Sequence, residues 1–325
     1  MAVLLFNPTL KDNNGTLNSN LGDIIITQAV MAEMNRLFPG EEVVSISSHT
    51  QPGDAEISKI KRARHRIVGG TNVLGSDMRN CRQWSIPGKV MALHPAVLCG
   101  VGWQHYQPPV KLFTRVLLFS ALSRTYVHSV RDRYTKKKLA SCGVWNVVNT
   151  SCPTLWGFAG QKKVVNDQKP AKSVLLMLTD YRTNEEADSL LVSCLGGHYQ
   201  TIYFWPQGEM DLSYLQGLIG DKCLKLVVLE RTLDALDACL STVPDLDYVG
   251  TRLHGGIRCL IAGKRSLILQ VDNRATEIAG ETGLPALPRT DLPNIKKWVE
   301  VGWKSEIFVD EKPINRWRAQ FATAK

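Results

Sequence analysis

The chain has 325 residues, of which 44% are hydrophobic and 21% charged, and its formal net charge is +9. This composition is typical of a soluble globular protein, and the length is enough for two domains of about 150 residues each. No apolar run approaches the ~18 residues of a membrane-spanning helix. The positive charge suits an anionic substrate, a nucleic acid or a membrane surface, but no aromatic recognition motif accompanies it, so nucleic-acid binding is not expected.

Cysteine usage and the N-terminus indicate the compartment. The eight cysteines show no C-x-x-C pair or other metal-ligand spacing, and several lie inside apolar runs. This pattern favours a reducing environment without a disulfide framework and without a metal site. The N-terminus lacks the basic region and apolar length of a signal peptide, so we expect a cytoplasmic protein. The basic run Lys59–Arg66 is expected to be a solvated helix face, with peripheral contact to the anionic inner face of the membrane as the alternative.

The first half of the chain alternates apolar strands with helices. Helices are predicted from Asn20 to about Leu37, from Pro109 to Leu122 with the proline near the first helical position, and from Tyr134 to Cys142. Strands are predicted at Ala2–Phe6, Val43–Ser47, His65–Val68, Lys89–Leu93, Ala96–Val101 and Tyr126–Val130.

Polar residues follow several of these strands. An Asn- and Gly-rich loop leads from the first strand to Asp23, a geometry that binds anions or sugars, although Asp23 capping the helix is an equal alternative. Gly69 and Gly70 follow the third strand and permit close backbone approach. Arg131 and Asp132 follow the strand that ends at Val130, where an arginine can grip a carboxylate or phosphate with two hydrogen bonds. A surface arrangement without function is the alternative for this arginine.

A polar linker over Gly157–Ser173 separates a second alternating block. Two late amphipathic segments, Lys296–Val301 and Ile314–Phe321, follow this block. The alternation in both halves predicts two parallel-sheet domains, at residues 1–160 and 170–305. The second block has predicted strands at Val174–Thr179, Thr201–Trp205 and Leu224–Leu229. Its predicted helices are Glu185–Leu195, which ends at two glycines, Asp211–Ile219 and Leu233–Leu240.

The stretch that begins at Val249 contains predicted helix and strand elements with charged residues at their ends. It reads as a flexible turn with Thr251 as a helix N-cap, a helix over His254–Ala262 closed by Gly263, and a buried strand over Ser266–Val271. Arg252, His254 and Arg258 are expected at the helix opening, and Asp272, Asn273 and Arg274 follow the strand. An anion between these edges would meet arginines, a helix terminus and a histidine. The alternative is a structural Arg252–Asp272 ion pair beside a buried histidine.

The same residues resemble a known family. Gly250–Arg258, with the sequence GTRLHGGIR, and Val271–Ala275, with the sequence VDNRA, are similar to the C-terminal signature of the polysaccharide pyruvyl transferases. Asn20–Asp23 resembles that family's N-terminal Asn-x-Gly-Asp element, and Gly69–Asn72 its glycine-rich strand end. Its middle signature resembles Arg131 and Asp132 followed by a helix and the sequence CPTLW of residues 152–156.

The resemblance implies an α/β fold of two Rossmann-like parallel-sheet domains facing a cleft, similar to the GT-B type. The first domain would be the acceptor side and the second the donor side, with a C-terminal helix in residues 306–325 returning to the first. The implied enzyme is a transferase that forms a pyruvate ketal on a sugar of a cell-surface polysaccharide or its lipid-linked precursor. Phosphoenolpyruvate is the implied co-substrate, and neither a cofactor nor a metal is expected.

Phosphoenolpyruvate carries a phosphate and a carboxylate, so more than one arginine is expected around it. Addition to its double bond needs an acid and a base; His254 suits one role, and Asp23 or Asp132 the other. The residues implied by the resemblance are Arg131, Arg252, Leu253, Arg258 and Arg274 for the donor, Asn20, Asp23 and Asn72 for the acceptor, and His254 and Asp23 for catalysis.

Two other functions fit part of the sequence. A GT-B glycosyltransferase would use the same frame and arginines to bind the pyrophosphate of a nucleotide sugar, but no clear Glu-x7-Glu pair occurs near residues 260–290. A binding subunit that has lost its chemistry is the third hypothesis, and the presence of both Arg252 and His254 speaks against it. The acceptor sugar and the oligomeric state stay open at this point.

Overall fold

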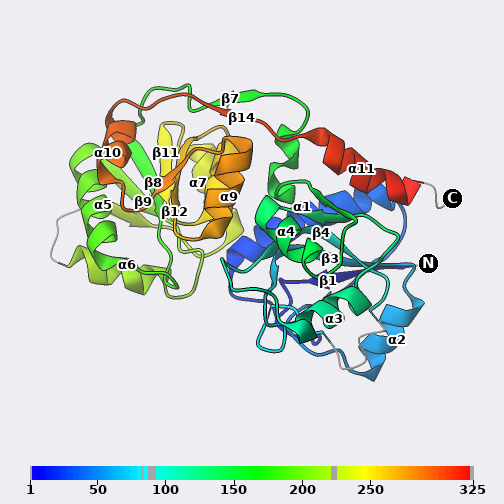
Figure 1. The fold of residues 1–325 in the computed structure, drawn as a ribbon. Coiled ribbons are helices and arrows are strands. Elements are labelled where there is room, and N and C mark those ends of the chain that lie inside the picture. Colours follow the sequence, from blue (N-terminus) through cyan, green and yellow to red (C-terminus); the bar gives the residue numbers. More distant parts are fainter. Residues whose placement is uncertain (1, 82, 87–92, 221–224, 323–325) are drawn as a thin grey trace. The chain divides into compact units, whose positions relative to one another are not determined.

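The computed structural model describes residues 2–81, 83–86, 93–220 and 225–322 of the chain, and Figure 1 shows it as a ribbon. The chain divides into two compact units. The first unit consists of Met1–Asn18, Ile26–Gln161 and Val309–Lys325. The second unit consists of Ser19–Ile25 and Lys162–Phe308. The boundary therefore falls inside the first helix, and the C-terminal segment belongs to the first unit.

The first unit is built on a six-stranded parallel sheet in the order β2-β1-β3-β4-β5-β6. The interior strand β1 (Val3–Asn7), next to the edge strand β2, is buried at every position, as in a sheet covered on both faces. The other strands are β2 (Val43–Ser47), β3 (His65–Leu74), β4 (Ala96–Trp103), β5 (His128–Val130) and β6 (Val147–Asn149). The helices are α1 (Leu21–Leu37), α2 (Asp54–Arg62), α3 (Leu112–Ala121), α4 (Arg133–Ala140) and α11 (Glu311–Ala322), with a 3₁₀ helix at Pro153–Phe158.

The second unit repeats this plan with the strand order β10-β9-β8-β11-β12-β13, again all parallel. Two short strands of this unit, β7 (Lys163–Val165) and β14 (Ser305–Ile307), form a separate antiparallel pair outside the six-stranded sheet. The sheet consists of β8 (Ser173–Met177), β9 (Thr201–Phe204), β10 (Leu226–Val228), β11 (Leu246–Gly250), β12 (Arg265–Gln270) and β13 (Ala286–Pro288). The helices are α5 (Glu185–His198), α6 (Asp211–Ile219), α7 (Leu233–Thr242), α8 (Leu253–Ile261), α9 (Asn273–Thr282) and α10 (Leu292–Glu300).

The strand order places the site in the second unit. From β8 the chain proceeds through β9 and β10 toward one edge of the sheet, and then returns to the other side of β8 with β11, β12 and β13. The order therefore reverses between β8 and β11. At such a switch point the loops after the two strands lead in opposite directions, and the space at their carboxyl ends is where open α/β sheets bind ligands.

A cluster of apolar side chains on one face holds the second sheet in place. Val174 and Leu176 of β8 are fully buried and belong to one cluster with Leu195 of α5 and Trp298 of α10. Complete burial of one such side chain stabilises the fold by about 1.5–3 kcal/mol. The polar loops at the carboxyl edge are thus fixed to a close-packed layer.

Most predicted elements are present, but several bounds differ. The third strand continues through Gly69 and Gly70 to Leu74, so Gly69–Asn72 is a strand interior and the predicted strand end there is wrong. Helix α3 has Lys111 as its N-cap, so Pro109 precedes the helix instead of occupying its first turn. Helix α5 continues through Gly196 and Gly197 to His198. Of the predicted strand Lys89–Leu93, only Leu93 is described, and it lies in a turn.

The largest correction concerns the segment before α8. Residues Leu246–Gly250 form the buried strand β11, and Gly250 is no flexible turn. A Cβ atom on Gly250 would lie 2.3 Å from the carbonyl oxygen of Met177, so only glycine permits the contact between these strands. Asp247 interrupts the apolar pattern of the strand. It is buried because Arg265 donates to it, with Nε 2.9 Å from Oδ1. At the other end of α8, Gly263 has φ +76° and closes the helix as predicted.

The basic run Lys59–Arg66 is not one helix face. Helix α2 ends at Arg62, and His65 is a buried residue of β3. Arg66 donates to the carbonyl oxygens of Ile60, at 2.6 Å, and His94, at 3.0 Å. Part of this run therefore stabilises the first unit internally. Within the described part of the chain, no helix has the length and apolar character to cross a bilayer.

Candidate functional site

The carboxyl edge of the second sheet gathers most of the predicted site residues. The loops after β8, β9, β11 and β12 end there, and the first turn of α1 belongs to the same unit. Hydrogen bonds connect these segments through Asn20, Asp180, Gln207, Asp211, Arg252 and Arg274.

Asp211 connects three of these loops. Its carboxylate is fully buried and accepts five hydrogen bonds. Oδ2 accepts from the backbone N–H groups of Gln207, at 3.0 Å, and Gly208, at 2.8 Å, which follow β9. Oδ1 accepts from the backbone N–H of Asp180, at 3.1 Å, which follows β8. The guanidinium of Arg252, which follows β11, donates to both oxygens.

Arg252 is held in a fixed orientation by this carboxylate. Its side chain is 4% exposed, and its Nε lies 2.9 Å from Oδ2 of Asp211. Asp180 accepts a further hydrogen bond from Nη2 at 3.2 Å, and the ring of Tyr181 lies 5.2 Å from the guanidinium carbon. The remaining Nη1 group has no hydrogen-bond partner among the described residues. The structural partner of Arg252 is therefore Asp211, and the Arg252–Asp272 pair offered as an alternative is wrong.

Glycines allow the close packing around Arg252. A Cβ atom on Gly208 would lie 2.4 Å from Nη2 of Arg252, inside the volume that the guanidinium occupies. Glycines also allow helix α8 to pack closely on the sheet. A Cβ atom on Gly255 would lie 2.4 Å from the sulfur of Met177. One on Gly256 would lie 2.5 Å from the ring of Tyr248. The Gly-Gly pair of the predicted signature thus brings the start of α8 against β8 and β11.

The N-terminus of α8 lies next to this arginine. Arg252 is the N-cap residue, so the predicted N-cap Thr251 is one residue early, and the side chain of Arg252 makes no capping hydrogen bond. Leu253 and His254 form its first turn and are 6% and 3% exposed. The first backbone N–H groups of a helix have no partner within the helix and carry a partial positive charge, so they attract anions.

The first turn of α1 contacts the loop after β9. The side-chain oxygen of Asn20 accepts from the backbone N–H of Gly22, at 3.1 Å, and from Nε2 of Gln207, at 3.2 Å. Its Nδ2 group donates to Oδ2 of Asp23, at 3.2 Å. Asn20 therefore caps this helix, which leaves the buried Asp23 in the first turn rather than at the cap. The structure thus brings two of the three predicted acceptor residues, Asn20 and Asp23, together with Gln207.

Arg274 lies at the start of α9, after β12. Its Nε donates to Oδ2 of Asp272 at 2.8 Å, and its Nη2 donates to the hydroxyl of Tyr181. Asp272 also accepts the backbone N–H of Arg274 at 2.9 Å and so caps α9. Burial disfavours the charged guanidinium, but Tyr181, Asp272 and Asp23 outweigh this effect and raise the pKa of Arg274. Its contact with Tyr181, in the loop after β8, places Arg274 at the carboxyl edge.

Arg258 does not belong to this cluster. It lies in the last turn of α8, and its Nε donates to Oδ1 of Asp237 in α7 at 2.6 Å. The expectation that Arg258 stands at the helix opening is wrong, because it lies in the last turn of α8, about 1.7 helical turns after Arg252.

Arg131 and Asn72 lie in the first unit. Arg131 is 1% exposed at the end of β5, and its Nη2 donates to the side-chain oxygen of Asn72. Its Nε lies 3.5 Å from Oδ2 of Asp132, whose other oxygen caps α4 by accepting the N–H of Thr135 at 2.6 Å. The residue before Asn72, Thr71, has φ +119°, which is strained for a β-branched side chain. Residues predicted for the donor and the acceptor thus contact each other.

Sequence reasoning missed four residues of the second unit: Asp180, Tyr181, Gln207 and Asp211. Each follows the carboxyl end of a predicted strand, and Asp211 stands at a predicted helix start, so a signal was present. Their partners are not visible in the sequence, because they depend on how separate loops meet. Among the described residues, no three His, Cys, Asp or Glu side chains gather in a way that could hold a metal ion.

Comparison with solved structures shows the fold class. S. aureus MnaA with UDP has a TM-score of 0.53 at 11% sequence identity, over 98% of this chain and 90% of that chain. The N. meningitidis UDP-GlcNAc 2-epimerase bound to UDP-GlcNAc has 0.43 at 13%, over 100% and 94%, and E. coli heptosyltransferase WaaC with ADP has 0.39 at 13%, over 92% and 97%. The predicted α/β fold with two Rossmann-like parallel sheets of GT-B type is confirmed.

The sequence comparisons identify the family. None of the curated proteins matches the chain. The family model described as polysaccharide pyruvyl transferase matches residues 20–273, which is more than half of the chain. The matched stretch begins at Asn20 and ends at Asn273, so it spans the segments that form the carboxyl edge of the second sheet. This chain belongs to the polysaccharide pyruvyl transferase family.

Proposed function

We propose that the protein transfers the pyruvyl group of phosphoenolpyruvate to a sugar of a cell-surface glycan or its lipid-linked precursor and forms a ketal. The observation that supports this most is the family match over residues 20–273. The arrangement at the carboxyl edge of the second sheet agrees with it, because the matched residues Asn20, Asp23 and Arg252 lie together there, and Arg274, directly after the matched stretch, contacts the loop after β8.

The donor would bind at the start of α8. The N-terminus of this helix and the Nη1 group of Arg252 supply hydrogen-bond donors for an anionic group. Arg252 is already neutralised by Asp211, so it acts as an oriented donor more than as a source of net charge. Arg274 is likewise paired with Asp272. Such fixed donors need no reorganisation when charge develops during the reaction.

The reaction needs two proton transfers in each half. First, a base removes the proton of a sugar hydroxyl, whose oxygen bonds to the central carbon of the donor while an acid protonates the methylene carbon. A second hydroxyl of the same sugar then loses its proton to a base and bonds to this carbon, while the bond from this carbon to the phosphate oxygen breaks and an acid protonates the departing inorganic phosphate. His254 and Asp23 are the residues that we assign to these roles, because both are in the matched stretch and a histidine exchanges protons near neutral pH.

The test is phosphate release from phosphoenolpyruvate in the presence of a panel of glycosides. Arg252→Ala should lower the rate by roughly 10²-fold or more, as for other lost transition-state donors. Arg258→Ala is the matched control, since this arginine of the same helix pairs with Asp237 away from the cluster. It should stay within a few-fold of wild type. Equal losses in the two variants, or no effect of Arg252→Ala, would refute the proposed donor site.

A further inference from the structure

Helix α3 exposes an apolar face in the first unit. Its residues Thr114, Leu118 and Ala121 are buried against the core. The opposite face carries Leu112, 76% exposed, and Val116, 59% exposed. Phe113 and Phe119 on this helix are also exposed, at 42% and 37%. Residues 112, 116 and 119 follow each other at helical spacing, so they form one stripe on the solvent side.

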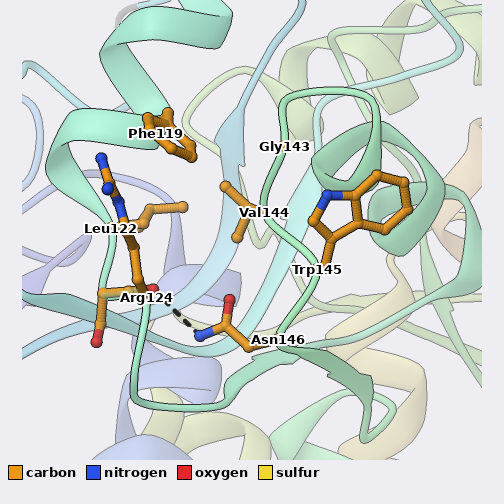
Figure 2. A pocket seen from close by; sticks show the side chains of 8 residues that line it. Phe119, Leu122, Arg124, Gly143, Val144, Trp145 and Asn146 are labelled. Carbon is orange, nitrogen blue, oxygen red and sulfur yellow. Dashed lines mark hydrogen bonds between the residues drawn. The ribbon is translucent and has the colours of Figure 1, made fainter.

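The stripe continues onto the turn after α4. Phe119 and Trp145 border one pocket of about 240 Å³, together with Leu122 and Val144. Figure 2 shows Phe119 at the end of α3 on one side of this pocket and Trp145 on the other side of Val144. Trp145 is 76% exposed. Contiguous apolar surface of this kind marks a docking site on a soluble protein more often than chance exposure does.

Arginines surround these apolar side chains. The guanidinium carbon of Arg79 lies 4.0 Å from the ring centre of Phe113, and that of Arg124 lies 3.9 Å from the ring centre of Phe119. Arg115 is exposed on α3 itself, next to Val116. We call the set Leu112, Phe113, Val116, Phe119 and Trp145 with Arg79, Arg115 and Arg124 the α3 face.

We propose that the α3 face docks on an anionic lipid bilayer. A helix that lies in the membrane interface combines aromatic and aliphatic side chains with arginines that meet the lipid phosphates, and tryptophan is enriched at this depth. The formal charge of +9 adds long-range attraction to such a surface. A second copy of the chain fits less well, because a symmetric contact would bring two surfaces of the same positive charge together. This proposal is independent of the donor chemistry of the second unit.

The test is co-sedimentation of the full-length protein with vesicles of phosphatidylcholine, with and without phosphatidylglycerol. Binding is expected only with phosphatidylglycerol, and it should weaken with added salt. Val116→Glu should lower binding at least about tenfold, since it replaces an inserted apolar group by a repelled charge. Leu190→Glu is the matched control, because Leu190 is an exposed apolar residue within α5 of the second unit, and it should bind as wild type does.

A second pair of variants tests the charges. Arg79→Gln and Arg124→Gln should each weaken binding to phosphatidylglycerol vesicles by roughly fivefold. The melting temperature of every variant shows whether it is folded. Equal binding to neutral and anionic vesicles, or equal loss in Val116→Glu and Leu190→Glu, would overturn the proposal. A dimer in solution that Val116→Glu dissociates would also overturn it, because the face would then belong to a second copy of the chain.

Discussion

Replacement of Asp211 by asparagine tests the organisation of the carboxyl edge. The change keeps the size of the side chain but turns one carboxylate oxygen into a hydrogen-bond donor. If the remaining oxygen faces the N–H groups of Gln207 and Gly208, the new amide group faces the N–H of Asp180 and Nη2 of Arg252, which are both donors. The variant therefore loses hydrogen bonds on one side and removes the fully buried counter-charge of Arg252, which keeps only the partly exposed carboxylate of Asp180 at 3.2 Å.

The expected cost follows from burial. Asp211 is fully buried and Arg252 is 4% exposed, and breaking such a pair costs about 3–5 kcal/mol. For a unit of this size, that loss should lower the melting temperature by about 6–20 °C. Asp237→Asn provides the matched control. It breaks the same kind of Arg–Asp pair, with Arg258, but the two side chains are 46% and 25% exposed. An exposed pair contributes about 0–1 kcal/mol, so this variant should melt within a few degrees of wild type.

The assay is thermal unfolding of both variants beside the wild type, followed by circular dichroism and by tryptophan fluorescence. Two units need not unfold in one step, so the two signals are compared and the transition that moves is assigned to the second unit. Equal shifts for Asp211→Asn and Asp237→Asn would refute the argument that burial decides the cost. A loss of less than about 1 kcal/mol in the free energy of unfolding of Asp211→Asn would refute the role of Asp211 in connecting the loops.

Two further predictions use other contacts. Gly208→Ala places a Cβ atom 2.4 Å from Nη2 of Arg252, so transferase activity should fall at least about tenfold. The control is Gly217→Ala, in open space on α6, which should leave activity unchanged and stabilise the fold by up to about 1 kcal/mol. Equal activities of the two variants would contradict this prediction. Burial lowers the pKa of His128 from 6.5 to about 4, so the stability that its neutral ring contributes is complete above pH 6.5 and is lost as the pH falls toward 4, by about 3 kcal/mol. The melting temperature should therefore fall less steeply between pH 7 and pH 4.5 for His128→Gln than for the wild type. Equal falls in melting temperature would contradict this prediction.

The elements that the sequence predicted best are those with uninterrupted patterns. β2 and α6 have the predicted bounds, because an apolar run and an acidic helix start are local signals. β11 was missed because Asp247 looks out of place in a buried strand until its partner Arg265 is known. β3 was cut short at Gly69, because glycines read as a strand end although here they lie against Leu5 and Ile26.

For the candidate site, the sequence likewise predicted the location of residues but not their partners. The sequence indicated that Arg252, His254 and Arg274 lie at the end of the second sheet, since residues that follow parallel strands share one edge. It did not indicate what each arginine contacts. The carboxylate that holds Arg252 is 41 positions away in the chain, and the nearby Asp272 pairs with Arg274 instead. Pairing is decided by the positions of the loops, and the order of strands in the sheet sets these positions.

The most direct test of the proposed donor is a comparison of ligands by thermal shift. The wild type and Arg252→Ala are melted with phosphoenolpyruvate, UDP, ADP and UDP-sugars. A ligand present at about 100 times its dissociation constant adds about 2.7 kcal/mol to the stability of the unit that binds it. We expect a rise in melting temperature with phosphoenolpyruvate in the wild type and none in Arg252→Ala. A rise with a nucleotide or UDP-sugar and none with phosphoenolpyruvate would contradict it and favour a nucleotide-sugar glycosyltransferase.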